Sequence, residues 1–291
     1  MTLRDVVLPA LKVSIMLLVL ALGLLSTQKE ALYLLTRPRL LFRSMLAMTL
    51  VMPIVAAALA AGFNLNPAVK IALVALSVSP VPPLFPRKAI KAAGENAYPV
   101  GLLVAAALLA VVFVPFAIDV LGNAFGKPVH VPVATVVKVV LSAVLAPLAV
   151  GILLRRWRPE LAHRMARPVS FVGNILLIAV LVPILFTAGK AMWSLVGNGT
   201  LASFAFFIIA GLVSGHLLGG PPQNQRPVLA LATAMRHPGM ALAIATTTFP
   251  QQKLVMPAVL LYLILAAFLT ALYLNWYRRT QPASREERLA A

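Results

Sequence analysis

The chain of 291 residues is 61% hydrophobic and only 11% charged, with a mean hydropathy of +0.96. Soluble globular domains are nearer half apolar and a quarter charged, so this composition excludes a water-soluble enzyme. A membrane helix needs about 20 apolar residues, and the apolar share suffices for about nine such helices with short connections. The absence of cysteine excludes disulfides, thiolate catalysis and cysteine metal sites.

Apolar runs bounded by charges and turn residues predict an all-α membrane protein with nine transmembrane helices. The whole chain, residues 1–291, is expected to form one integral membrane domain, with a first repeat over 6–121, a second over 131–277 and a cytoplasmic tail over 278–291. The nine spans are expected near residues 6–27, 40–62, 67–93, 97–121, 131–154, 168–191, 200–219, 227–248 and 253–277.

The net charge of +18 is distributed unevenly over the predicted connections. Odd-numbered connections and the C-terminal tail carry 17 of the 25 basic residues, whereas the N-terminus and the even-numbered connections carry six. This asymmetry predicts a multi-pass protein of a bacterial-type plasma membrane, with the N-terminus outside and the C-terminus in the cytoplasm. It places an Arg155–Arg167 loop in the cytoplasm and the connections at Asn64 and Lys127 outside. The basic excess is therefore an orientation signal, and no nucleic-acid partner is expected.

Two of the nine spans contain residues that break a helix. In the third span, Pro80, Pro82, Pro83 and Pro86 follow one another closely, and proline lacks the N–H that continues a helix. The eighth span contains the segment 235–240, with Arg236, His237, Pro238 and Gly239 in an otherwise apolar run. Irregular backbone at membrane depth must face protein or a water-filled cavity, so both breaks are expected to point inward.

The position of the breaks indicates an inverted repeat. Each broken span is the penultimate one of its half, and the two spans cross the membrane in opposite senses. Paired interrupted helices in two halves are typical of secondary transporters, whose substrate site lies where the breaks meet. We therefore expect a secondary carrier that works by alternating access.

The residues at the two breaks resemble those of the bile acid:sodium symporter family. The similarity is sharpest at Ser79-Pro80 followed by Gly94, and over Leu231–Ala245 with Gly239 and the Met240–Ala245 run. The resemblance implies a panel domain and a core domain, two crossing broken helices in the core, and transport of organic anions, usually with sodium. The chain resembles the nine-span members with an external N-terminus.

The residues that hold sodium in this family are replaced here. Matched to the family pattern, its Ser-Asn pair becomes Phe85 and Pro86, and its hydroxyl positions fall near Pro99 and Leu103. Its Glu, Gln and Asn become Ala232, Arg236 and His237. Hard cations require several oxygen ligands, so coupling to sodium through the usual side chains is not expected. No cofactor is expected, and coupling to protons through His237 is the alternative.

Arg236 has two possible roles. It can supply in covalent form the positive charge that sodium supplies elsewhere and pair with a carboxylate or sulfonate, or it can cap carbonyls at the break and never meet the substrate. The expected partners are a small organic anion and the lipid bilayer, with no obligate protein partner. The candidate substrate-binding or crossover residues are Arg236, His237, Pro238, Gly239, Thr233, Pro80, Pro82, Pro83, Pro86, Lys88 and Lys91.

Two further features leave alternatives open. Gly211, Gly215 and Gly219 form a small-residue run that predicts close helix packing inside the bundle, with a dimer face as the alternative. The chain could also be a membrane sensor or receptor that kept the carrier fold, although it has no soluble output domain. The arrangements of an intramembrane protease are absent from the sequence, so we expect no enzyme.

Overall fold

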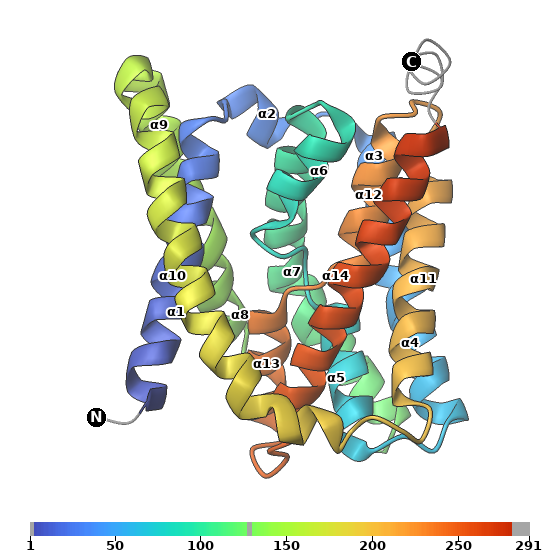
Figure 1. Ribbon diagram of the computed structural model, residues 1–291. Coiled ribbons are helices and arrows are strands. Elements are labelled where there is room, and N and C mark those ends of the chain that lie inside the picture. Colours follow the sequence, from blue (N-terminus) through green and yellow to red (C-terminus); the bar gives the residue numbers. More distant parts are fainter. Residues whose placement is uncertain (1–2, 127–129, 281–291) are drawn as a thin grey trace.

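The computed structural model describes residues 3–126 and 130–280, and every regular element in these two ranges is a helix (Figure 1). The helices, including two π-helices, are α1 (Leu3–Leu24), α2 (Gln28–Leu32), α3 (Pro38–Met45), η1 (Leu46–Val51), α4 (Met52–Gly62), α5 (Pro67–Val78), α6 (Phe85–Ala93), α7 (Ala97–Ala124), α8 (Val133–Val140), η2 (Leu141–Leu145), α9 (Ala146–Trp157), α10 (Pro159–Trp193), α11 (Thr200–Leu218), α12 (Gln225–Ala234), α13 (Pro238–Thr248) and α14 (Val255–Thr280).

These helices confirm the all-α membrane fold. Among the described residues, seven helical runs are long and apolar enough to cross a membrane, and Pro9–Leu24 and Pro67–Val78 are shorter apolar helices. The third predicted span consists of α5 and α6, and the eighth consists of α12 and α13, so both predicted breaks are present. The predicted connection at Lys127 and the tail from residue 281 onward lie outside the described residues.

Local sequence explains where several helices begin. The side chain of Asn66 accepts a hydrogen bond from the N–H of Ala68, and Pro67 occupies the first turn of α5, where its missing N–H costs nothing. At α2, Thr27 and Glu30 form a reciprocal capping box. Pro86 likewise lies in the first turn of α6. The first break therefore ends at Leu84, two residues earlier than the prolines suggested.

The predicted Arg155–Arg167 loop is wrong. Helix α9 continues to Trp157 and α10 begins at Pro159, so only Arg158 lies between them. Arginine is a good helix former, and Pro159 is well suited to the first turn of a helix, so charge there marks the edge of the membrane and not the end of the helix. Helix α14 similarly continues to Thr280, into the predicted tail.

The helices divide into two groups by their contacts. Helix α1 packs mainly against α9 and α10, and these three lie together at the left of Figure 1. The second group contains both broken spans, with α5 against α4, α13 and α14, and α12 against α11 and α6. Most of the buried apolar side chains of the described residues belong to one large cluster that includes α5, α7, α12 and α13.

The glycine run of α11 allows an unusually close approach to α12. A Cβ atom added at Gly215 would lie 2.5 Å from the Cα atom of Ala230, and one at Gly211 would lie 2.9 Å from the Cα atom of Ala234. Only glycine permits such contact between two helix backbones. The predicted packing inside the bundle is thus confirmed, and α11 holds α12 directly before the second break.

Candidate functional site

The two breaks meet in the interior of the bundle. The first break comprises residues 79–84, between α5 and α6, and the second comprises residues 235–237, between α12 and α13. The backbone N–H of His237 donates a hydrogen bond of 3.0 Å to the carbonyl oxygen of Pro80. Backbone groups released by the two interruptions therefore satisfy one another, as the low polarity of a membrane interior requires.

Arg236 connects this crossing to a third helical segment. Its Nη1 donates to the carbonyl oxygen of Ser79 at 3.1 Å, and its Nη2 donates to the carbonyl oxygen of Met48, in η1, at 3.0 Å. The residue is only 2% exposed. Its Nε is buried and has no hydrogen-bond partner among the described residues. The guanidinium thus links the two breaks to η1 through backbone oxygens.

The local structure of η1 explains why the Met48 carbonyl is available. In a π-helix each carbonyl bonds to the N–H five residues later, which for Met48 is residue 53. Residue 53 is Pro53, in the first turn of α4, and it has no N–H to donate. Pro53 thus removes one intrahelical donor next to the π-helix, and the Met48 carbonyl accepts from Arg236.

His237 caps α13. Its Nδ1 accepts a hydrogen bond of 3.2 Å from the N–H of Met240, so the ring is neutral with its proton on Nε2 when this bond is made. The Nε2 atom is buried and has no partner among the described residues. A ring of this kind can hold a proton, but in this conformation it acts on the backbone of its own helix.

The crossing is too tightly packed to hold an organic solute in this conformation. The void bordered by Arg236, Met48, Ser79 and Pro80 measures about 10 Å³. That is near the smallest space that accommodates one water molecule. The geometry at Arg236 is therefore that of the capping role, whereas direct contact with an anion stays a prediction.

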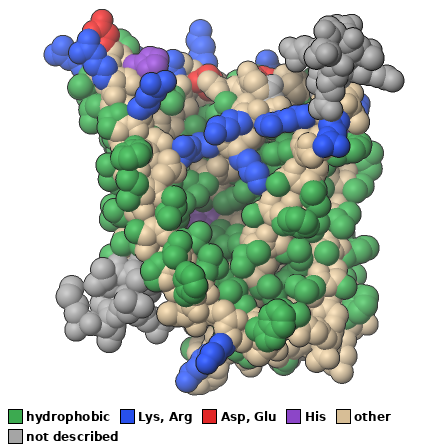
Figure 2. Space-filling model, in the orientation of Figure 1, with side chains coloured by type: hydrophobic (Ala, Val, Ile, Leu, Met, Phe, Trp, Pro, Cys, Tyr) green, Lys and Arg blue, Asp and Glu red, His purple; other side chains and the backbone are tan. Residues whose placement is uncertain are grey.

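The cations of α6 lie in a more open position. Figure 2 shows a hollow in the face turned toward the viewer, with lysine and arginine side chains gathered along its upper margin. The Nζ of Lys88 donates to Thr270 Oγ1 of α14 at 2.7 Å, and Nη1 of Arg87 donates to Asn174 Oδ1 of α10 at 3.1 Å. Both partners are neutral, so the two positive charges are not cancelled. Lys91 is exposed.

The remaining candidate residues have structural positions at the breaks. Thr233 donates its hydroxyl to the Leu229 carbonyl of its own helix, and Pro238 begins α13. A Cβ atom added at Gly239 would lie 3.1 Å from the His237 ring. The Pro82 carbonyl accepts the N–H of Phe85. Pro83 is buried and Pro86 lies in α6.

Several residues at the site were not predicted from sequence. Tyr262 of α14 donates to the carbonyl oxygen of Ala234, directly before the second break. Met48, Asn174 and Thr270 contribute acceptors to the cations described above. Of these, only Met48 has a signal in the sequence, because Pro53 five residues later interrupts the hydrogen bonding of an apolar span.

The described residues contain no group of three or more His, Asp and Glu side chains that could hold a metal ion. Among the oxygens at the crossing, the main-chain carbonyls of Ser79 and Met48 already accept from Arg236, and the Ser79 hydroxyl donates to the Ala75 carbonyl.

Residues 12–195, more than half of the chain, match the Sodium Bile acid symporter family. No curated protein matches the chain. With its apolar helices, the chain is a multi-pass integral membrane protein, and the matching family is one of transporters and not of enzymes. The protein belongs to the Sodium Bile acid symporter family, and family membership makes it a secondary transporter.

Proposed function

We propose that the protein carries small organic anions across the membrane by alternating access, and that it does so without sodium. Family membership supports secondary transport. The two breaks support it further, because interrupted helices that meet at a crossing are the usual substrate region of transporters with inverted repeats. On this reading residues 6–121 and 131–277 form the two repeats, with the N-terminus outside and the C-terminus in the cytoplasm.

The position of the Arg236 guanidinium is the main observation that supports transport without sodium. A bound sodium ion would need several oxygen ligands at the crossing. Arg236 already donates to the oxygens of Ser79 and Met48, and the positions matched to the family's sodium ligands hold Phe85, Pro86 and Ala232. The guanidinium thus supplies a fixed positive charge and links the two breaks to η1.

An anionic substrate is supported by the cations of α6. Lys88 and Arg87 bond to neutral side chains, and the described residues place no carboxylate within ion-pair distance of either. A carboxylate or sulfonate that reaches α6 can therefore pair with Arg87 through the bidentate fork of a guanidinium and with Lys88 as a point charge. Helix α6, which carries both cations, follows directly on the first break, so the substrate would bind next to the crossing.

The experiment that tests this function has two stages. Small organic anions are first screened for those that raise the melting temperature of the purified protein in a sodium-free buffer. Uptake of a stabilising anion into proteoliposomes is then measured with sodium, potassium or choline as the external cation. We expect equal uptake in the three media, because no ion has to fill the crossing.

A steep dependence of uptake on sodium would contradict the proposal, and would mean that carbonyls and water hold the ion without side-chain ligands. Uptake that rises at acidic pH in the wild type, but not in His237→Gln, would instead show proton coupling through that ring. If neutral analogues raise the melting temperature and the corresponding anions do not, the substrate is not an organic anion.

A further inference from the structure

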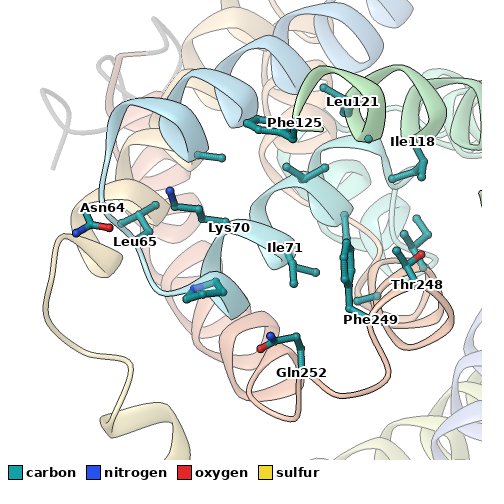
Figure 3. A pocket seen from close by; sticks show the side chains of 17 residues that line it. Asn64, Leu65, Lys70, Ile71, Ile118, Leu121, Phe125, Thr248, Phe249 and Gln252 are labelled. Carbon is teal, nitrogen blue, oxygen red and sulfur yellow. The ribbon is translucent and has the colours of Figure 1, made fainter. Parts of the chain in front are cut away.

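A cavity of about 470 Å³ lies at the end of the bundle where α4 ends and α5 begins, the lower end in Figure 1 (Figure 3). Its walls come from α4, α5, α7 and α13 and from the segment that follows α13. This volume is within the range of small-molecule sites. The cavity is distinct from the region around the α6 cations, since none of these cations lines it.

The lining combines an apolar surface with one positive charge. Lys70 is the one charged residue among those that line the cavity, and the lining includes no carboxylate. Lys70 lies near the start of α5, half-buried; its backbone N–H donates to the Asn66 carbonyl oxygen, but its side-chain ammonium makes no hydrogen bond or ion pair with any described residue. Close to a helix N-terminus a lysine is unfavourable for the helix itself, because both carry positive charge. Helix stability therefore does not explain this lysine.

The cavity also contains a hydroxyl without a partner. Thr248 Oγ1 is buried and bonds to no described group. By contrast, Thr246 Oγ1, two residues earlier on α13, donates to the carbonyl oxygen of Leu242. A buried hydroxyl usually finds a partner, so Thr248 is an unsatisfied polar group in the wall of the cavity. Figure 3 shows Phe249 and Gln252 beside it, with Ile118 and Phe125 lining the space from α7.

We infer that this cavity is a binding site for a small amphipathic monoanion, whose carboxylate or sulfonate pairs with Lys70 and whose apolar body packs against Ile71 and Phe249. The choice of an anionic ligand rests on the proposed function, whereas the cavity and its lysine do not depend on it. The cavity reaches Ala75 and Ile244, and the carbonyl oxygen of Ala75 accepts the Ser79 hydroxyl at the first break. The inner end of the cavity, at Ala75, thus lies one helical turn from the first break, on the side away from α6.

The test uses the absence of cysteine in the chain. A cysteine is introduced by Ile71→Cys in the cavity wall, and the full-length protein in liposomes is treated with a small methanethiosulfonate reagent. Octanoate is the probe, with octanol and octylammonium as its neutral and cationic analogues. At an octanoate concentration about ten times its Kd, we expect modification to slow roughly tenfold, since the reagent reaches only unoccupied protein. Octanol and octylammonium should protect much less.

Charge reversal makes the test specific. In the double variant Ile71→Cys/Lys70→Glu, octylammonium should protect the cysteine and octanoate should no longer do so. The control is Lys253→Glu in the same Ile71→Cys background. Lys253 is exposed and lies outside the cavity at the same end, so octanoate should still protect the cysteine. Gln251→Cys, also exposed and outside the lining, should not be protected by any probe. Equal protection by octanol and octanoate, or unchanged protection in Lys70→Glu, would overturn the inference and show a cavity that accepts any aliphatic chain. Because no ion gradient is used, a negative result here leaves the transport assay unaffected.

Discussion

The two breaks that meet at the crossing differ in the hydrogen-bonding groups they offer. The first break contains Pro80, Pro82 and Pro83, which have carbonyl oxygens but no N–H groups, so it has an excess of acceptors. The second break presents the Arg236 guanidinium and the N–H of His237, which are donors. Each interruption would be costly alone in a membrane, and together they are complementary. The donors of the second break therefore meet the acceptors of the first across the crossing.

The largest expected effect comes from removing the donor side of this pair. Arg236→Ala leaves the carbonyls of Ser79 and Met48 buried without partners, and should destabilise the protein by roughly 3 kcal/mol or more, because each unsatisfied group costs about 1–3 kcal/mol. Transport should be lost with it. The measurement is the melting temperature in detergent together with anion uptake.

Arg236→Met serves as the matched control, because it restores much of the lost volume without restoring a donor. If the hydrogen bonds dominate, it should be nearly as unstable as Arg236→Ala. Arg236→Lys should fall between wild type and alanine, since one ammonium does not reproduce the two-pronged guanidinium. A methionine variant as stable as the wild type would show that the carbonyls do not need Arg236.

A smaller effect is expected where α11 supports the second break. Gly215→Ala places a Cβ atom 2.5 Å from Ala230, and the two helices must separate. Overpacking of this kind typically costs about 1–3 kcal/mol. Gly189→Ala in α10 is the control, because no atom lies within 4 Å of its added Cβ. Denaturant or thermal unfolding of the two variants should differ in this direction. Equal stability would mean that α11 does not hold α12 in place.

The smallest effect is expected at the cap of α13. His237→Ala removes the acceptor for the Met240 N–H and should cost about 1 kcal/mol, whereas His237→Asn keeps a capping acceptor and should recover most of that loss. Thermal melting of both variants is the measurement. An asparagine variant as unstable as the alanine variant would assign His237 a role other than capping.

The breaks were predictable because their cause is local. A proline cluster and a charged residue beside Pro238-Gly239 are visible in any apolar run, and the rule that buried backbone must be satisfied then predicts that the interruptions face each other. The expected spans followed for the same reason, from the length and composition of each run, and among the described residues seven helical runs are long enough to cross a membrane while two apolar helices are shorter.

The partners of Arg236 were not predictable in the same way. The sequence left two roles open, and only the position of Met48 in a different helix distinguishes them in this conformation. Met48 contributes a main-chain oxygen, so its side chain carries no information about the contact. The junction of α9 and α10 was missed for another reason, since arginines mark the membrane boundary as readily within a helix as in a loop.

The π-helix η1 makes residues 53 and 236 dependent on each other. A substitution of Pro53 that supplied an N–H would let Met48 bond within its own helix, and the guanidinium would then lose one of its two acceptors. Conversely, loss of Arg236 would leave a helix defect with nothing to satisfy it. Among relatives of this chain, we therefore expect Pro53 and Arg236 to be retained together or replaced together, as two halves of one evolutionary change.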